Sequence, residues 1–478
     1  MMEVKLSREQ ILLVIIEAAV KKFETINQKL QDQLYRYGVT NLFNRKYLLE
    51  QGNQYLKGGK YNTLVVVDVR NLRTYNEIFG YDTTDKILRA LALKIREYCG
   101  KSCLVGSLDS GRFWILAKIE GENKEKLAEE KAKELIKFLS DDELKIKINR
   151  EELIFLVALN IGIAFYPQHG RDIGELLMAA EMATDKAKDK GMNTVILFQE
   201  DFKKEVEENI RIEEQLRKAI KTGKIEQQIY PVFQLKVNPN SQEVAGVEVL
   251  MRWKLHPQIF KVILIAEKTG LIKDLFEVLI KKTVPVIKSA LEIYPSLPFG
   301  FNISPVQLES VDDLNKTFNY LIKENIEPQR IQLEITETKM LEIQEVEDTL
   351  REFINRGFKL VIDDFGKGYS SFDRLKTWDI YGVKIDRSLI ADIPQKFKQF
   401  GDQAREFKFI KNLISFLKSM GYVVTVEGVE TPEMVELAKR LQVDEVQGFY
   451  YSKPVDEEKF LKCLREWDQR VKSPFSKN

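Results

Sequence analysis

Cysteine and histidine are scarce in this chain, which has three cysteines and two histidines among 478 residues. Cys99, Cys103 and Cys463 are too few for a disulfide framework, and no second thiol pair is present to complete a zinc site. We therefore expect a reducing, cytoplasmic environment and no structural zinc.

An excess of charge of one sign is also missing. The 74 lysines and arginines are balanced by 73 aspartates and glutamates, which leaves a net charge of +1. Nucleic-acid binding through overall charge needs a strongly basic chain, so we expect no nucleic-acid partner. The 44% hydrophobic share is enough for folded cores, and the length is typical of two to four domains.

Long apolar runs are absent as well. The longest run near the start, residues 11–16, is closed by Glu17, whereas a membrane span takes about 20 apolar residues. We therefore expect neither a membrane span nor a signal peptide.

Apolar residues near the start instead follow helical spacing. They recur in alternating steps of four and three from Leu12 to Tyr37, through Ile16, Phe23 and Leu30, with Gln33 as a polar exception. This spacing predicts a helix over residues 7–36 with one apolar stripe. The stripe either packs on the chain's own domain or pairs with a second copy, and we expect a parallel homodimer.

The rest of the chain reads as two mixed α/β regions joined by a charged helix over 201–221. In the first region we expect helices over 85–98 and 175–188 and strands over 63–69, 104–106, 113–117, 153–165 and 195–198. In the second region strands alternate with helices, and we place them at 229–235, 244–253, 299–303, 331–336, 359–364, 382–385, 422–426 and 445–450. The alternation predicts a barrel of parallel strands, and the domains are expected at 1–38, 39–200 and 201–478.

Acidic and amide side chains stand at the ends of many of the second region's strands. They are Glu248, Asn302, Glu334, Glu337, Asp363, Asp364, Glu427 and Glu430. The C-terminal ends of barrel strands meet on one face, where unpaired carboxylates repel one another unless cations relieve the repulsion. Hard oxygen ligands favour Mg²⁺ or Mn²⁺, and two such ions about 3.5–4 Å apart are the usual apparatus for phosphodiester hydrolysis.

The motifs around these residues resemble the EAL domain, the cyclic di-GMP phosphodiesterase family, over about residues 205–470. They are Glu248-Val249-Leu250, Asn302-Ile303-Ser304, Glu334-Ile335-Thr336-Glu337, Asp363-Asp364-Phe365-Gly366, Lys384-Ile385-Asp386-Arg387-Ser388, Glu427-Gly428-Val429-Glu430 and Gln447-Gly448-Phe449. The resemblance implies a TIM-barrel-like fold, two Mg²⁺ or Mn²⁺ ions, and hydrolysis of cyclic di-GMP to linear pGpG.

The resemblance also implies roles for individual residues. The implied metal ligands are Glu248, Asn302, Glu334, Asp363, Asp364 and Glu427. Lys384 would hold the attacking water, with Glu427 beside it, and Glu337 would hold the loop after Asp364. The implied substrate pocket comprises Arg252 on the phosphate together with Leu250, Gln447, Glu430 and the residue at position 230.

Three departures from the family pattern touch substrate binding or loop positioning and leave every implied metal ligand in place. Tyr230 replaces a substrate-contacting glutamine, the loop after His256-Pro257 is shortened, and Lys367 replaces a threonine. They keep an alternative open, a catalytically silent cyclic di-GMP receptor or protein-interaction module. Retention of Lys384 and Asp364 favours the enzyme.

Residues 39–200 resemble a second family, the GGDEF diguanylate cyclase domain, an α/β sandwich around a mostly antiparallel sheet. The matching segments are residues 40–45, 160–164 and 187–193. Asp68 aligns with the first metal ligand of that family, and Asn76 and Asp85 align with its guanine-reading residues. The resemblance implies a vestigial GTP site at these three residues.

The signature hairpin of this second family is degenerate here. It reads Asp109-Ser110-Gly111-Arg112-Phe113, so Arg112 stands where an acid is needed, and Arg70 replaces the second metal aspartate. Two cations in a two-metal site repel Mg²⁺. We therefore expect no cyclase activity and a regulatory role for this domain.

Overall fold

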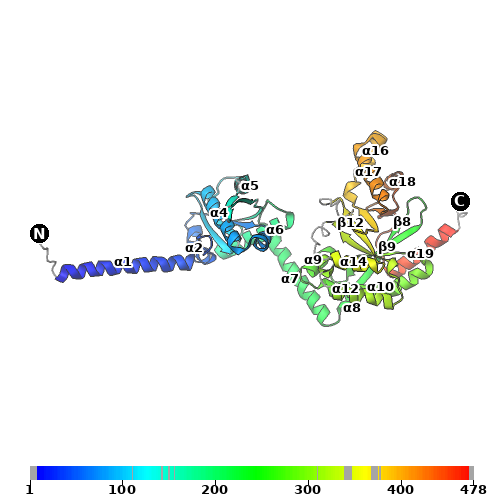
Figure 1. Ribbon diagram of the computed structural model, residues 1–478, viewed down its shortest axis with the longest axis horizontal. Helices are drawn as coiled ribbons and strands as arrows, with labels where there is room; N and C mark the ends of the chain where they lie inside the picture. The colour runs from blue at the N-terminus through cyan, green and yellow to red at the C-terminus, as the bar shows by residue number, and fades with distance from the viewer. Residues whose placement is uncertain are drawn as a thin grey trace. The chain divides into compact units, whose positions relative to one another are not determined.

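The computed structural model describes residues 8–109, 111–141, 144–148, 151–155, 157–308, 311–337, 347–367, 375 and 378–472. Contacts divide the chain into two compact units, Met1–Glu208 and Asn209–Asn478. The division falls inside helix α7 (Glu200–Lys221; Figure 1). The three domain ranges expected from the sequence stay predictions.

Helix α1 (Arg8–Tyr35) occupies the segment in which apolar spacing predicted a helix. Its stripe is not covered by the described part of the chain: Phe23 is 71% exposed, and Ile16 and Leu30 are exposed too. Packing of the stripe on the chain's own domain is therefore not seen, and the homodimer stays a prediction.

The first unit is built on a five-stranded sheet in the order β2-β3-β1-β6-β7. The strands are β1 (Thr63–Val69), β2 (Leu104–Asp109), β3 (Arg112–Ala117), β6 (Leu159–Phe165) and β7 (Thr194–Leu197). Only β6 and β7 pair in parallel, so the mostly antiparallel sheet is confirmed.

Alternation along β1 gives this sheet two covered faces. Val65 and Val67 belong to a core with helices α4 (Tyr81–Cys99) and α5 (Lys124–Asp141). Leu64 and Val66 belong to a second core with α2 (Arg45–Lys57) and α6 (Ile173–Lys190). Successive strand residues point to opposite faces, so one apolar strand supplies both layers.

The single strand expected over 153–165 is wrong. β5 (Glu151–Phe155) forms a separate two-stranded sheet with β4 (Leu144–Ile148), and β6 begins only at Leu159. The carbonyl of Ala158 instead accepts a hydrogen bond from Arg70 N at 2.9 Å, so the chain leaves one sheet before it enters the other. The apolar sequence is continuous across this break and gives no sign of it.

The second unit is a closed eight-stranded barrel in the order β10-β11-β12-β13-β14-β15-β8-β9. Its strands are β8 (Ile229–Val237), β9 (Val244–Trp253), β10 (Phe299–Asn302), β11 (Ile331–Thr336), β12 (Lys359–Phe365), β13 (Gly382–Ile385), β14 (Val423–Val426) and β15 (Glu445–Gln447). All eight overlap the predicted strands, and the TIM-barrel-like fold is confirmed.

One strand corrects the expectation of an all-parallel barrel. β8 runs antiparallel to both of its neighbours, β15 and β9. Residues 238–243 are the whole connection from β8 to β9, which suits a hairpin, whereas a parallel crossover takes about a dozen residues or more.

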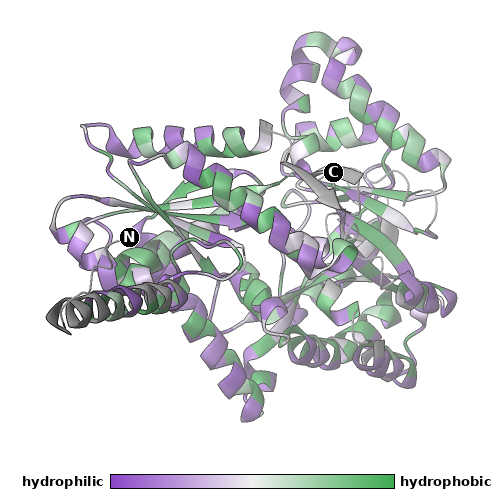
Figure 2. Cartoon of the chain, turned by 60° about the vertical axis from the view of Figure 1, so that its left-hand side comes forward, coloured by the Kyte–Doolittle hydropathy of each residue, from purple (hydrophilic) through white to green (hydrophobic). Residues whose placement is uncertain are grey.

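Helices surround the barrel and share its core. The longer ones are α7, α9 (Ile259–Lys268), α10 (Ile272–Ile293), α12 (Val311–Lys323), α14 (Glu347–Asn355), α17 (Arg405–Ser419), α18 (Pro432–Arg440) and α19 (Glu457–Lys472). Short ones among the described residues are α8 (Ile225–Gln228), α11 (Pro305–Leu308) and α16 (Ile393–Phe400). Hydrophobic and hydrophilic residues alternate along most helices (Figure 2), and among the described residues none of the helices has the length and apolarity needed to cross a bilayer.

The exposed stripe of α1 yields a first prediction. We expect Phe23→Lys to convert a dimer of the full chain into a monomer, because it places a charge in the middle of the apolar stripe that the two copies of α1 would bury against each other. The control Glu24→Lys introduces the same residue at an exposed position beside the stripe. Sedimentation equilibrium measures both masses, and equal masses for the two variants and the wild type would contradict the coiled coil.

Candidate active site

The barrel gathers its strand-end acids around one buried lysine. The Lys384 side chain is 1% exposed, and its Nζ lies within ion-pair distance of four carboxylates: 3.3 Å from Glu248 Oε2, 2.8 Å from Glu334 Oε2, 3.2 Å from Asp363 Oδ1 and 2.9 Å from Glu427 Oε1. Five residues singled out from the sequence therefore meet at one point, although they come from five different strands or strand ends.

The carboxylates form two overlapping clusters, in each of which one oxygen per residue lies within 4.8 Å of the others. One cluster is Glu248, Glu334 and Asp363, and the other is Asp363, Asp364 and Glu427. Asp363 belongs to both. Asn302 adjoins the first cluster, where its Nδ2 donates to Glu248 Oε1 at 2.7 Å. This all-oxygen donor set fits Mg²⁺ or Mn²⁺.

A bulge lets two consecutive acids face the same site. Neighbouring residues of a regular strand point to opposite faces, but the register of β12 shifts between Ile362 and Phe365. Asp364 adopts a positive φ of 55°, and its N–H donates to Asp363 Oδ1 at 2.8 Å. The strained residue is thus a part of the cluster, as strained residues in functional sites often are.

The charges of the site are unbalanced. Burial raises the pKa of Asp363 to about 8; Lys384 opposes the rise, and Glu427 adds to it. Burial also raises the pKa of Glu427. Burial works against ionisation of Glu248 too, but there Lys384 and Lys236 prevail and lower the pKa to about 2. The buried acids therefore resist being ionised together, and a bound cation would relieve their mutual repulsion.

Lys236 is a site residue that sequence analysis missed. Its Nζ lies 2.5 Å from Glu334 Oε1 and 3.0 Å from Gln332 Oε1, and the side chain is 1% exposed. Gly300 makes room for this pair, because a Cβ there would lie 2.0 Å from Glu334 Oε1. The available signal was alternation in β8, where Lys236 stands two residues after Gln234 and shares its face.

A cavity of about 310 Å³ opens beside the acids. Its polar lining includes Arg252, Asn302, Glu334, Asp363 and Asp364, and its apolar wall comes from β9, α9 and α10: Val249, Leu250, Met251, Ile259, Phe260, Ile263, Ile272, Phe276 and Leu279. The predicted substrate contacts Arg252 and Leu250 both line it. Arg252 is half-buried, and burial lowers its pKa even though Tyr230 and Glu248 oppose the shift.

The other implied site residues contact an acid, the loop after Asp364 or a neighbouring arginine. Gln447 Nε2 donates to Glu248 Oε2 at 2.5 Å and so holds a carboxylate. Glu337 Oε2 accepts from Gly366 N at 2.8 Å, on the loop after Asp364. Glu430 pairs with Arg387 at 2.5 Å, outside the two acid clusters.

Tyr230 lies opposite Arg252 in the β8–β9 register but is not among the residues that line the cavity. The structure therefore places it beside the phosphate-binding candidate and not in the described wall.

In the first unit, basic side chains contact Asp68, the acid that the sequence analysis aligned with a metal ligand. Arg112 Nε lies 3.1 Å from Asp68 Oδ1, and Lys188 Nζ lies 2.8 Å from the same oxygen. Sequence analysis expected Arg112 there and missed Lys188. Arg70 does not bond Asp68 in the described part of the chain, and its Nε is buried there without a hydrogen-bond partner.

The two candidate guanine readers of the first unit line one cavity. Asn76 and Asp85 face a space of about 630 Å³ together with Leu72, Tyr81 and Leu88. Asn76 Oδ1 is buried, and no group among the described residues bonds it. The cavity therefore has room and an unused acceptor, which suits a ligand with N–H donors.

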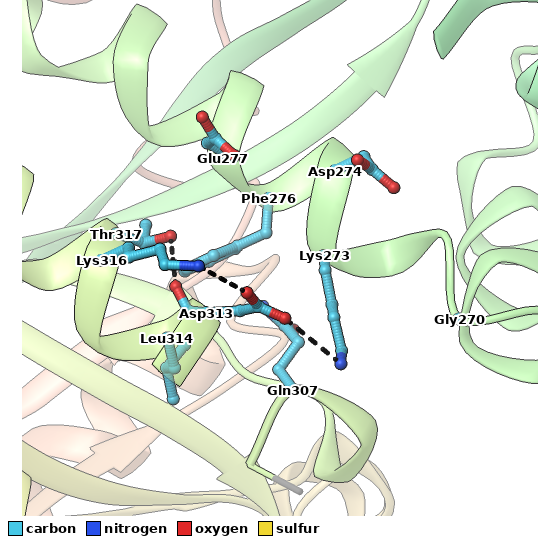
Figure 3. A pocket seen from close by; sticks show the side chains of 10 residues that line it. All are labelled: Gly270, Lys273, Asp274, Phe276, Glu277, Gln307, Asp313, Leu314, Lys316 and Thr317. Atoms are coloured by element: carbon cyan, nitrogen blue, oxygen red, sulfur yellow. Dashed lines mark hydrogen bonds and ion pairs between the residues drawn. The ribbon is translucent and has the colours of Figure 1, made fainter. Parts of the chain in front are cut away.

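A further cavity of about 250 Å³ lies between α10 and α12 (Figure 3). Its central charges are paired with one another: Asp313 lies 3.5 Å from Lys273 Nζ and 3.4 Å from Lys316 Nζ. None of the strand-end acids lines this space. It shares the lining residues Phe276 and Gln307 with the cavity of about 310 Å³, so the two cavities are neighbours.

Two family models match the chain in tandem. The model of the diguanylate cyclase GGDEF domain matches residues 35–194, and that of the EAL domain matches residues 213–454, more than half of the chain. The predicted order of the two domains is confirmed.

Curated relatives from Pseudomonas aeruginosa include the cyclic di-GMP phosphodiesterase NbdA, 25% identical over 449 residues, and the bifunctional diguanylate cyclase/cyclic di-GMP phosphodiesterase MucR, 27% identical over 450 residues. These alignments cover 91% and 92% of this chain but 55% and 62% of the relatives. The chain thus spans little more than half the length of these relatives.

Among solved structures, a Vibrio cholerae LapD S helix-GGDEF-EAL structure bound to c-di-GMP has a TM-score of 0.58 and 16% identity. The match covers 91% of this chain and all of that one. At this identity the likeness speaks for the fold alone.

The raised pKa of Asp363 yields a prediction about stability. The neutral acid is favoured in the folded chain, because its pKa of about 8 exceeds the 3.8 of an ordinary aspartate. Its contribution is therefore complete below about pH 4 and is lost as the pH rises through about 8. In chelator, we expect the Tm of the wild type to fall over this range by a few degrees more than that of Asp363→Asn.

Circular dichroism in a pH series measures these melting temperatures. Asp402→Asn, at an exposed aspartate, is the control and should keep the wild-type slope. Identical slopes for the wild type and Asp363→Asn would show that the folded chain does not raise the pKa of Asp363.

Proposed function

The chain belongs to the tandem GGDEF–EAL family, and from that premise we propose that it is a metal-dependent phosphodiesterase that hydrolyses cyclic di-GMP to pGpG. The observation that carries the proposal is the pair of carboxylate clusters that share Asp363 and surround Lys384 beside the Arg252 cavity. Relatives named as cyclic di-GMP phosphodiesterases support the substrate.

The residues divide the chemistry among them. Arg252, at the cavity wall, binds a phosphate of the substrate, and the apolar wall covers the nucleotide. Glu248, Asn302, Glu334, Asp363, Asp364 and Glu427 would hold two Mg²⁺ or Mn²⁺ ions. When bound, such ions supply Lewis acidity toward the phosphoryl oxygens and lower the pKa of a water.

Lys384 orients the attacking water, because its ammonium group reaches both clusters. The water gives up a proton as its oxygen forms a new bond to phosphorus, one phosphodiester P–O bond breaks, and the departing ribose oxygen takes up a proton. Glu337 contributes by holding the turn after Asp364 through Gly366.

The first unit has a regulatory role in this proposal and makes no cyclic di-GMP. Arg112 and Lys188 pair with Asp68, and their positive charges repel Mg²⁺ from this acid. GTP binding in the cavity of Asn76 and Asp85 is a subsidiary part of the proposal. The cytoplasmic setting and the homodimer belong to the proposal as well.

A second candidate function is a silent receptor that binds cyclic di-GMP without hydrolysis. The observation that favours it is Tyr230, which stands opposite Arg252 where the family carries a glutamine. The activity test below separates the two, because a receptor binds the nucleotide and leaves it intact.

We expect Glu248→Gln to lower hydrolysis by about 100-fold or more, because it removes a charged ligand at the centre of the first cluster. The control Glu436→Gln changes an exposed glutamate of α18 and should keep wild-type turnover. Chromatography of pGpG formed with Mg²⁺ or Mn²⁺ measures both rates. A wild type that binds cyclic di-GMP but yields no pGpG would favour the receptor.

We expect no cyclic di-GMP from GTP and Mg²⁺. The Glu248→Gln background is the appropriate one, because any product formed there escapes degradation. Accumulation of cyclic di-GMP would contradict the proposal that the site at Asp68 cannot support cyclase activity. Calorimetric titration with GTP tests whether the cavity of Asn76 and Asp85 binds this nucleotide. Equal heats of binding for the wild type and Asn76→Ala would show that Asn76 does not contribute to GTP binding.

A further inference from the structure

Lys367 places a third lysine on the acid clusters, in the turn that follows β12. Its Nζ lies 2.5 Å from Asp364 Oδ1 and 2.9 Å from Asp386 Oδ2. Asp364 belongs only to the second cluster, so this contact distinguishes the second cluster from the first. The mechanism proposed above does not use Lys367.

The position of Lys367 is fixed by its turn. Lys367 N donates to Asp364 O at 3.2 Å, and Gly366, with a φ of 101°, donates to Glu337 Oε2. A Cβ on Gly366 would clash with Leu389 at 2.2 Å. The backbone therefore holds Lys367 beside Asp364.

The three lysines of the site differ in how easily they leave it. Lys384 and Lys236 are each 1% exposed, whereas the Lys367 side chain is 49% exposed and faces water. A half-exposed ammonium group exchanges a carboxylate partner for water at little cost. Lys367 is thus the one of the three that a competing cation can displace.

Asp386 gives Lys367 a second partner that does not belong to either cluster. Its own N–H donates to Phe365 O at 3.2 Å, and its Oδ1 accepts from Ser388 N at 2.8 Å. This carboxylate is therefore fixed, and it can keep Lys367 nearby after Asp364 has turned to another cation.

We propose that Lys367 is an internal counter-ion of the second cluster, which a divalent cation must displace from Asp364, so that the two metal positions fill with unequal affinity. The inference deepens the proposed function and rests on it in taking both clusters as cation sites. An ammonium group and a divalent cation on one carboxylate repel each other, so binding at the second position is weakened and binding at the first is not. Lys367 is in this sense a positioning residue that sets metal occupancy.

Calorimetric titration of the metal-free full chain with MnCl₂ tests the inference. We expect two binding steps in the wild type, and in Lys367→Thr we expect the weaker step to tighten by roughly 10- to 100-fold while the tighter step stays unchanged. Lys367→Arg retains the charge and should keep the wild-type separation of the steps. Lys398→Thr, at an exposed lysine of α16, is a control for removal of any surface charge.

Each result decides between the possibilities. Superimposable isotherms for the wild type and Lys367→Thr, in a protein that hydrolyses cyclic di-GMP, overturn the inference and leave the proposed function intact. The same shift in Lys367→Arg or Lys398→Thr overturns it too, because charge at Asp364 is then not the cause. No Mn²⁺ binding by any variant contradicts the metal centre itself, and the inference with it.

Discussion

Mutual repulsion among buried carboxylates is the constraint on which the barrel's functional face depends. Glu248, Glu334, Asp363 and Glu427 all contact Lys384, and two ammonium groups, those of Lys384 and Lys236, cannot neutralise four acids. Such an arrangement persists only if the fold holds the acids in place and a bound cation stabilises their charges. The closed barrel provides the enforcement, since each acid is carried by a separate strand or strand end whose position is set by its neighbours' hydrogen bonds.

The same charge chemistry has the opposite result in the first unit. There Asp68 is paired directly with two cations, Arg112 and Lys188, which also lie within ion-pair distance of Asp185. The two units thus differ in what occupies their acids: in the barrel the carboxylates outnumber the lysines that contact them, which favours a bound metal ion, whereas in the first unit basic side chains pair with the acid that would bind it. Lys367 lies between these cases, because it pairs with one acid of a cluster that contains two more.

Much of this could be predicted from the sequence because strand-end residues are set by local pattern. The acids, Lys384 and the eight barrel strands all follow from short apolar runs that end in polar residues. The direction of β8 and the break before Leu159 did not follow, because apolar runs encode burial and not pairing partners. Lys236 and Lys188 were missed for a related reason: only the three-dimensional register shows which acid a lysine reaches.

The central claim is that the two acid clusters are two cation positions that share Asp363. Anomalous diffraction from crystals of the full chain soaked in Mn²⁺ measures this most directly. The account predicts two peaks, one among Glu248, Glu334 and Asp363 and the other among Asp363, Asp364 and Glu427. Crystals without a peak at either cluster, in which Lys384 still contacts all four carboxylates, would contradict it.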